Sequence, residues 1–364
     1  MESSPRPERS RDAAQSKDRA RDSLPSHSLK LSVLDQSPIS AGATPTQAIS
    51  ETIELARAAD RLGYHRYWLA EHHSSGGLAG TAPEVLIARV AAETRDMRIG
   101  SGGVMLSHYA PLKVAEAFRV LEALYPGRID LGIGRAPGSD QHTARALQHG
   151  PGALGIEHFP SQIADLLAFL DNALPDGHPF AGVRAMPAGP GTPEFWLLGS
   201  SDQSAAYAAW FGAAFSFAHF INDQGGPEVM AAYRDHFRPS PRLAAPQGSI
   251  GVFVICAESE AEARRLAASR DLWRLRLDQG ILGPVPTVEE ALAYPYSEAE
   301  QARVAFHRRR QVVGDQDRVR ESLLALAARY GVDELVIVSV CHGFDPRLRC
   351  YELLAEAFAL PRRG

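Results

Sequence analysis

A carboxylate and two imidazoles stand together at Glu71, His72 and His73, directly after a short apolar run. Such groups can transfer protons or bind a metal ion. Adjacent strand residues point to opposite sides, so either Glu71 with His73, or His72 alone, would face a shared interior. The first apolar run ends in Leu-Asp-Gln at residues 34–36, without a His-x-His pair of metal ligands. We therefore expect no metal, and polar lining of a site is favoured over a core histidine.

Two glycine clusters end the next two apolar runs, Gly100-Ser101-Gly102-Gly103 and Gly132-Ile133-Gly134. Glycine within a strand indicates close approach of a ligand or of another backbone. Crowding inside a sheet would explain an isolated glycine, whereas three in four residues favour a flat ligand lying against the backbone. The second cluster is not a dinucleotide fingerprint, because Pro137 and a long loop follow it instead of a helix.

Two further segments could bind an anion. Arg135 follows the second glycine cluster and could hold a phosphate or carboxylate, or form a surface salt bridge. The turn Gly-Ser-Ser-Asp-Gln-Ser at residues 199–204 precedes a helical pattern, so its hydroxyls and free N–H groups could bind a phosphate. Ordinary N-capping by Ser201 or Asp202 is the alternative, and Asp202 would repel a phosphate if it pointed inward.

Short apolar runs alternate with helical patterns from Leu29 onward, which indicates βα units and a parallel sheet. Eight strands without a break between halves predict a single (β/α)8 TIM barrel, and an open doubly wound sheet is the competing fold. Catalytic groups then belong at the carboxyl ends of the strands. The predicted strands cover residues 29–35, 67–71, 97–105, 128–133, 194–198, 214–219, 249–256 and 334–340.

Residues 271–310 interrupt this alternation as an insertion after strand seven. An insertion of this length, read as a loop, predicts a lid, a binding segment or a partly disordered stretch. The run Arg308-Arg309-Arg310 is read as a solvated face. The aromatic residues are the candidates for substrate walls: Trp273, Tyr294, Tyr296 and Phe306.

Composition limits the classes of partner. The chain has 364 residues, 45% of them hydrophobic, and a net charge of -5 with both signs mixed, so we expect no nucleic-acid and no membrane partner. Three cysteines do not form a disulfide framework, which is typical of a cytoplasmic protein. Residues 1–27 are charged and poor in large apolar residues, so they predict a disordered N-terminal extension before a barrel over residues 28–364.

Three segments together resemble the bacterial luciferase-like flavin monooxygenase family. They are Tyr-Trp-Leu-Ala-Glu-His-His at residues 67–73, Ile-Gly-Ser-Gly-Gly-Val-Met-Leu at 99–106 and Pro-Gly-Arg-Ile-Asp-Leu-Gly-Ile-Gly-Arg at 126–135. Gly199-Ser200-Ser201 and Val313-Gly314 add to the resemblance, which runs from Leu29 to the C-terminus. It implies a (β/α)8 barrel that binds FMN or, in one branch of the family, the deazaflavin F420.

The resemblance also implies roles for individual residues. Gly102-Gly103 match the position where a non-proline cis peptide lies behind the isoalloxazine ring, and Met105 belongs to the same cofactor-binding strand. Glu71 matches a residue near the flavin, and His72 the active-site histidine. The implied phosphate-binding residues are Arg135, Ser200, Ser201 and Ser204.

Two positions depart from the family pattern. The luciferase cysteine beside the flavin is Gly134 here, so light emission is not implied. Tyr109 replaces a histidine near the reactive face of the flavin, and we include it with Glu71 and His72 among the candidate catalytic residues.

The leading hypothesis is a cytoplasmic, homodimeric monooxygenase that oxidises a small, apolar organic substrate with O2 and reduced FMN. A separate flavin reductase would supply the FMNH2. The alternatives are an F420-dependent oxidoreductase and a flavin-binding protein without turnover. The F420 tail would need a basic groove, and the run Arg308 to Arg310 is the only support for one. A metal-dependent barrel hydrolase is disfavoured by the missing ligand pattern.

Overall fold

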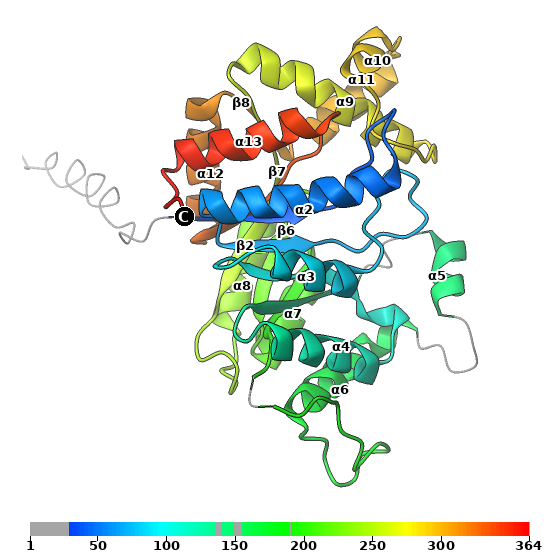
Figure 1. Cartoon of the computed structure of the whole chain (residues 1–364), viewed down its shortest axis with the longest axis vertical. Coiled ribbons are helices and arrows are strands. Elements are labelled where there is room, and N and C mark those ends of the chain that lie inside the picture. The colour runs from blue at the N-terminus through cyan, green and yellow to red at the C-terminus, as the bar shows by residue number, and fades with distance from the viewer. Residues whose placement is uncertain (1–28, 136–139, 149–154, 190, 364) are drawn as a thin grey trace, which may run out of the picture.

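Eight parallel strands close into a barrel in the computed structural model, which describes residues 29–135, 140–148, 155–189 and 191–363 (Figure 1). The expected extension over residues 1–27 lies outside the described residues. The barrel strands follow the chain in order, and the last pairs with the first, Lys30 opposite Glu334. They are β1 (Lys30–Asp35), β2 (Arg66–Leu69), β3 (Arg98–Met105), β4 (Ile129–Gly134), β5 (Glu194–Gly199), β6 (Ala214–Ala218), β7 (Gly248–Cys256) and β9 (Glu334–Val338).

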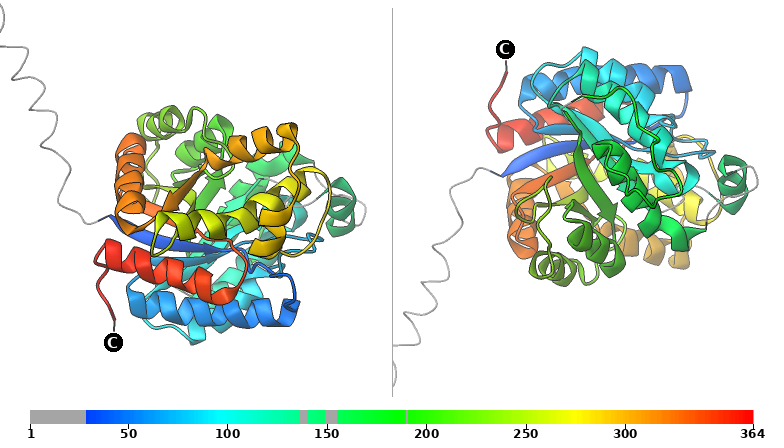
Figure 2. Two further views of the ribbon diagram at one scale, coloured as in Figure 1. Left: turned by 90° about the horizontal axis from the view of Figure 1, so that it is seen from above. Right: turned by 90° about the horizontal axis from the view of Figure 1, so that it is seen from below.

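Helices surround this barrel, as the views along the molecule show (Figure 2). They are α2 (Pro45–Leu62), α3 (Pro83–Ala92), α4 (Pro111–Leu124), α5 (Gln141–Leu147), α6 (Phe159–Asp171), α7 (Asp202–Phe211), α8 (Gly226–Asp235), α9 (Glu260–Asp278), α10 (Val288–Ala293), α11 (Glu298–Arg308), α12 (Gln316–Tyr330) and α13 (Phe344–Ala357), with 3-10 turns at Leu106–His108 and Ile156–His158. The predicted barrel is confirmed, although β2 ends at Leu69 and not at residue 71.

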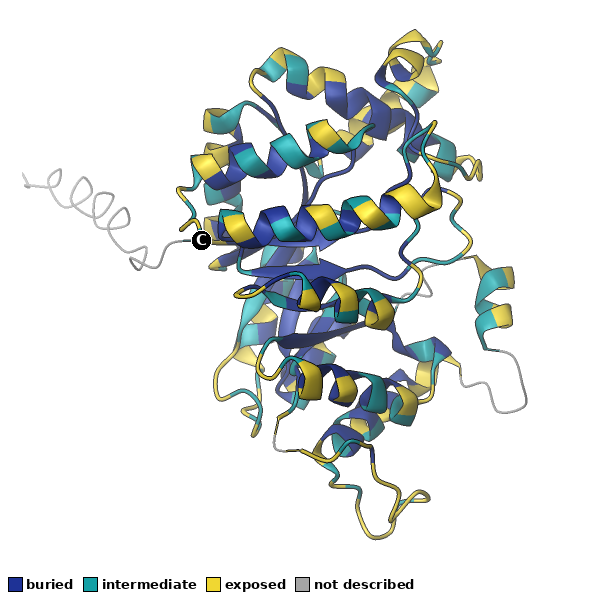
Figure 3. Ribbon diagram, in the orientation of Figure 1, coloured by how far each residue is buried: buried dark blue, intermediate teal, exposed yellow. Residues whose placement is uncertain are grey.

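The first helix illustrates why these segments are helical. Thr44 caps α2 by accepting a hydrogen bond from the Gln47 N–H, and Pro45 occupies the first turn, where no N–H is needed. Gly63 ends the helix in a left-handed conformation, and a Cβ there would lie 2.3 Å from the Pro361 carbonyl oxygen. Between these ends, most of the buried residues of α2 are alanine or leucine, and Figure 3 shows buried and exposed stretches alternating along the helix.

The insertion after β7 is folded, and the expectation of a long loop is wrong. Helix α9 continues to Asp278, and α10 and α11 follow before the additional strand β8 (Gln311–Gly314). Val285 exchanges backbone hydrogen bonds with Ile39 and Ala41, which ties the insertion to the loop after β1. Good N-caps at Thr287 and Ser297 explain why the two short helices form.

Strand β8 changes the pairing of β7. The first half of β7, from Ile250 to Phe253, pairs with β9, whereas residues 253–256 pair with β8. The insertion therefore enters the wall of the barrel at the carboxyl end of β7. Strand β8 was missed in the sequence because four residues directly after a helix show no recognisable alternation.

The core has two layers. Apolar side chains between strands and helices form the larger one, and a second cluster around Leu34, Trp68, Trp196 and Val336 fills the barrel interior. In Figure 3 the strands are correspondingly buried and the outer helix faces exposed. The three cysteines, Cys256, Cys341 and Cys350, are buried and unpaired. Among the described residues, no helix is long and apolar enough to cross a membrane.

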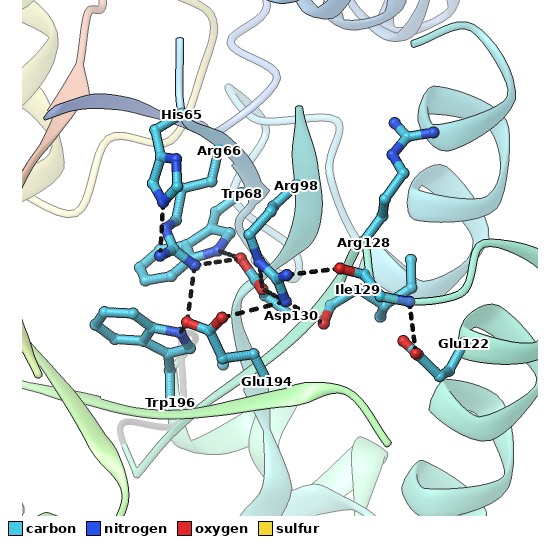
Figure 4. A network of polar contacts seen from close by, with 12 residues as sticks. His65, Arg66, Trp68, Arg98, Glu122, Arg128, Ile129, Asp130, Glu194 and Trp196 are labelled. Atoms are coloured by element: carbon cyan, nitrogen blue, oxygen red, sulfur yellow. Dashed lines mark hydrogen bonds and ion pairs between the residues drawn. The ribbon is translucent and has the colours of Figure 1, made fainter. Parts of the chain in front are cut away.

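A buried ionic network closes the amino end of the barrel (Figure 4). Arg66 donates to Glu334 at 2.6 Å and to Asp130 at 2.7 Å, and its guanidinium also reaches Glu194 at 3.2 Å. The Trp68 indole donates to Asp130, and the Trp196 indole to Glu194. Burial opposes the charge of Glu334, but Arg66 and the other donors lower the pKa of that carboxyl. All these groups lie at strand starts, away from the end where catalytic loops belong.

Candidate active site

A cavity of about 490 Å³ lies at the carboxyl ends of the barrel strands. It is lined by the ends of β1 to β6 and the loops that follow them, as expected for a barrel of this kind. All the predicted site residues except Tyr109 line it: Glu71, His72, Gly102, Gly103, Met105, Arg135, Ser200, Ser201 and Ser204.

Glu71 organises one wall of this cavity. Its carboxylate accepts from the Tyr109 hydroxyl at 2.6 Å, from His73 Nε2 at 2.7 Å and from the Met105 N–H at 2.9 Å. Burial and the hydrogen bond to Glu71 raise the pKa of Tyr109. Tyr109 therefore stays a neutral phenol turned to Glu71, where it positions the carboxylate behind the cavity wall.

His72 occupies a different position from its neighbours. Its backbone N–H donates to the Gly80 carbonyl, and its side-chain Nδ1 is buried with no hydrogen-bond partner among the described residues. Burial, with a smaller contribution from His73, lowers the pKa of His72 to about 4. The imidazole is therefore neutral at pH 7. Glu71 and His72 both line the cavity although they are adjacent, because β2 has already ended at Leu69.

The glycines serve the barrel as well as the cavity. The peptide bond between Gly102 and Gly103 is cis, as the resemblance implied. A Cβ on Gly102 would lie 2.6 Å from Leu34 Cδ1, and one on Gly103 would lie 2.6 Å from the Gly132 carbonyl oxygen. Crowding within the barrel thus accounts for these two glycines even without a ligand. Gly134 differs, because within the part of the chain that the structure describes no atom beyond its immediate neighbours lies within 4 Å of its Cβ position.

The residues predicted to bind an anion also line this cavity. Ser201 caps α7, its Oγ accepting from the Ser204 N–H at 3.4 Å, which confirms the capping interpretation of this turn. Arg135 donates to the amide oxygen of Gln203 and carries no carboxylate partner among the described residues. Asp202 is exposed and does not line the cavity. The repulsion that Asp202 could have caused is therefore absent from this cavity.

Several lining residues were not predicted. Gln36 follows β1, and Phe220 and Ile221 follow β6. Their only signal in the sequence is their place after a predicted strand. The insertion adds Trp273 to an adjoining cavity, as expected, whereas Tyr294 and Tyr296 pack against the insertion's own small core.

The fold and this cavity define a (β/α)8-barrel protein with a ligand site at the carboxyl ends of its strands. Comparison with known proteins identifies the family more closely. The profile of the luciferase-like monooxygenase family matches residues 29–334. The chain belongs to this family.

Individual relatives agree with this assignment. A luciferase-like monooxygenase of Escherichia coli (strain K12) is 39% identical, over 90% of this chain and 96% of the relative. The N-acetyl-S-alkylcysteine monooxygenase of Bacillus subtilis (strain 168) is 37% identical over 92% of this chain and all of the relative (100%). The crystal structure of apo-MsnO8 superposes with a TM-score of 0.85 and 45% identity, over 92% of this chain and 100% of that one.

More distant structures share the fold. The oxygenating constituent of 3,6-diketocamphane monooxygenase from Pseudomonas putida, solved with FMN, has a TM-score of 0.65 and 18% identity, over 91% of this chain and 98% of that one. An F420-dependent secondary alcohol dehydrogenase has a TM-score of 0.61 and 10% identity, over 91% and 99%. Barrels of this shape thus hold either FMN or F420.

Proposed function

We propose that this protein is a flavin-dependent monooxygenase that uses reduced FMN and O2 to oxidise a small organic substrate. The observation that carries the proposal is a single cavity joining a glycine wall at Gly102 and Gly103 to an anion-binding wall at Arg135 and Ser200. A flavin mononucleotide has a flat ring and a phosphate, which need these two kinds of surface.

Residues of this chain would divide the work of binding. Arg135 and the hydroxyls of Ser200, Ser201 and Ser204 would hold the phosphate, helped by the N-terminus of α7. Gly102, Gly103 and Met105 would contact the ring. Bound reduced FMN would supply the two electrons with which one oxygen atom of O2 becomes water while the other enters the substrate.

His72 would handle protons beside the ring. Its neutral imidazole has a free Nδ1, so it can accept a proton from a reacting group and return it. Glu71 would act through its contacts, because its carboxylate fixes the Met105 N–H and the Tyr109 hydroxyl. Tyr109 then becomes a positioning residue and not a proton donor to the substrate.

The surroundings of the basic run Arg308 to Arg310 favour FMN over F420 as the cofactor. The F420 tail is a polyglutamate and needs free cations along a groove. Arg308 instead pairs with Asp271 at 2.7 Å, and Arg310 donates to the Ile221 carbonyl and contacts His307. Arg309 lies 3.9 Å from Asp223. This run therefore has few free cations with which to bind a polyglutamate tail.

The proposal also covers the substrate and the source of electrons. The Bacillus subtilis relative is named for an N-acetyl-S-alkylcysteine, so S-alkyl thioethers are the first substrates to assay. A separate flavin reductase would deliver FMNH2, and the working form would be a homodimer, which sedimentation velocity would reveal as twice the 39.4 kDa chain mass.

Anaerobic titration tests the cofactor. Purified protein is titrated with FMN, FMNH2 and reduced F420, with tryptophan fluorescence as the readout. O2 is then admitted with a thioether, and incorporation of one atom of 18O into the product is measured by mass spectrometry. We expect FMNH2 to bind and the label to enter the product. Binding of F420 without binding of FMNH2 would overturn the proposal, and binding without turnover under any substrate would support the flavin-carrier alternative.

A further inference from the structure

A second cavity, of about 340 Å³, adjoins the proposed cofactor cavity. The two cavities share Gln36, His72, Phe220 and Ile221 in their walls. His72 therefore stands at the boundary between them. A molecule in the second cavity would lie next to the atoms that the first cavity presents.

The second cavity is strongly basic. Arg270, Arg274 and Arg310 line it together with His72 and His307, and none of its described lining residues is an aspartate or glutamate. Arg274 is already compensated from outside the cavity, because it pairs with Asp278, and the same carboxylate contacts His307 Nε2. Arg310 donates to the Ile221 carbonyl.

Arg270 is the exception. Its side chain is 5% exposed, and neither Nε nor Nη1 has an acceptor among the described residues. The neighbouring Asp271 raises the pKa of Arg270 through its charge, but its carboxylate accepts hydrogen bonds from Arg308 and Gln311. Burial lowers the pKa of Arg270 to about 9, which leaves the guanidinium charged at neutral pH. A buried charge without an acceptor is unfavourable, so this position is arranged for an anion that the protein itself does not provide.

The same guanidinium is held in place. It stacks on the Phe253 ring with 3.6 Å between the guanidinium carbon and the ring centroid. Stacking leaves the edge of the guanidinium, where its N–H groups point, free for two parallel hydrogen bonds to a carboxylate or sulfonate. The remaining walls are largely apolar, with Leu78, Trp273 and Leu277 among them.

We propose that this second cavity binds the substrate of the monooxygenase, and that the substrate is an organic anion. Its carboxylate or sulfonate would pair with Arg270, its apolar body would contact Trp273 and Leu277, and its reacting atom would lie near His72. The identification of the bound anion as a substrate rests on the proposed function. The anion site itself rests only on Arg270 and its cavity.

Calorimetric titration of the full-length, flavin-free protein tests the site with matched probes. Octanoate and octanamide have the same chain and differ in charge, and octane-1-sulfonate distinguishes the two acid head groups. We expect octanoate to bind at least about tenfold more tightly than octanamide, as for a hydrogen-bonded charge pair. The sulfonate compared with the carboxylate then identifies the preferred head group.

Substitutions at two arginines of α9 provide the test and its control. Arg270→Met is expected to abolish the advantage of octanoate over octanamide, and Arg270→Lys to keep part of it, because an ammonium cannot form the forked contact. Arg264→Met, on the exposed face of α9 where Arg264 pairs with Glu260, is expected to leave the advantage unchanged. If the methionine variant does not fold, the lysine variant and the probe comparison in the unaltered protein still decide.

Equal affinity for octanoate and octanamide, or an advantage that survives in Arg270→Met, would overturn the anion site. Titration with FMNH2 in parallel separates the two proposals. If the protein binds octanoate but not FMNH2, the anion site stands and the monooxygenase is rejected. If it binds FMNH2 without preferring octanoate to octanamide, the monooxygenase stands and the anion site is rejected.

Discussion

Gly134 offers a direct way to fill the proposed cofactor cavity. It lines the cavity, its Cβ position is open, and its φ is not in the left-handed region. We expect Gly134→Leu to raise the dissociation constant for FMNH2 at least about tenfold while the melting temperature stays within a few degrees. Gly102 is a poor choice for this purpose, because its Cβ would overlap Leu34 and Trp68 and disturb the barrel itself.

Gly177→Leu is the matched control for this change. Gly177 also has open space at its Cβ position and an ordinary φ, but it lies on an exposed loop outside the cavity. Fluorescence titration of both variants gives the comparison. Unchanged FMNH2 affinity in Gly134→Leu would remove the cofactor from this cavity.

His72 predicts a pH dependence of stability. Its pKa is about 4 in the folded chain and 6.5 when unfolded, so the unfolded chain takes up the proton first as the pH falls. Stability is therefore lost between these values. In His72→Asn, the loss of unfolding free energy between pH 7 and pH 4.5 should be smaller by about 2 kcal/mol.

Urea denaturation at the two pH values measures this difference. The exposed His142 serves as the control position, since His142→Asn changes a side chain that lines neither cavity. An equal loss in the unaltered protein and in His72→Asn would show that His72 is not buried as a neutral imidazole.

The N-terminus of α7 joins stability to binding at the level of an element. In Ser201→Ala the helix loses its cap, which costs about 1 kcal/mol. The proposed phosphate site also loses a hydroxyl, so we expect a smaller preference for FMNH2 over reduced riboflavin, by about threefold to tenfold. Denaturation and paired titrations with the two flavins measure the effects.

Ser259→Ala separates these two effects. Ser259 caps α9 in the same way, accepting from the Glu262 N–H at 3.2 Å, but it does not line the cavity. It should cost similar stability and leave the flavin preference unchanged. A preference that falls equally in both variants, or in neither, would contradict phosphate binding at α7.

The strand starts contain a network whose loss should be costly. Arg66→Met leaves Asp130, Glu194 and Glu334 without their buried cation, and we expect a loss of about 3–5 kcal/mol in the free energy of unfolding. The loss should be largest above the ordinary pKa of these carboxyls and shrink on acidification, because Arg66 lowers the pKa of Glu194 and of Glu334 against the effect of burial.

Urea denaturation of Arg66→Met and of Arg264→Met in parallel compares the stability lost from the buried network with that lost from an exposed ion pair. The Arg264–Glu260 pair is exposed, so its loss should cost less than about 1 kcal/mol. Similar losses in the two variants would mean that the network at the strand starts contributes no more than a surface pair.

At the scale of the whole molecule, the barrel could be predicted because its strands are local features. Each is an apolar run followed by an amphipathic helix, and their order along the chain is their order in the sheet. The same locality made Glu71, Gly102 and Arg135 recognisable, since each lies in or just after the carboxyl-terminal half of a strand. Strand β8 and helices α10 and α11 lack that signal, because they are short and polar segments fixed by caps and by contacts with α9.

The remaining features depend on residues far apart in the chain. Arg66 and Glu334 are 268 residues apart, so the local sequence around either residue does not predict the ion pair. Arg270 reads as one more arginine in a basic helix, and only the folded insertion buries it against Phe253. The role of Tyr109 likewise became visible only when its hydroxyl was seen to meet Glu71.

The filled amino end of the barrel has a consequence for kinetics. Because Arg66, Trp68 and Trp196 are buried and joined by the network of Figure 4, we expect cofactor, substrate, O2 and products to pass through one mouth, at the carboxyl ends of the strands. The two cavities meet in that mouth at His72. We therefore expect a compulsory order of arrival and departure, with a bound organic anion slowing the exit of the flavin, which stopped-flow measurements of flavin release with and without octanoate would reveal.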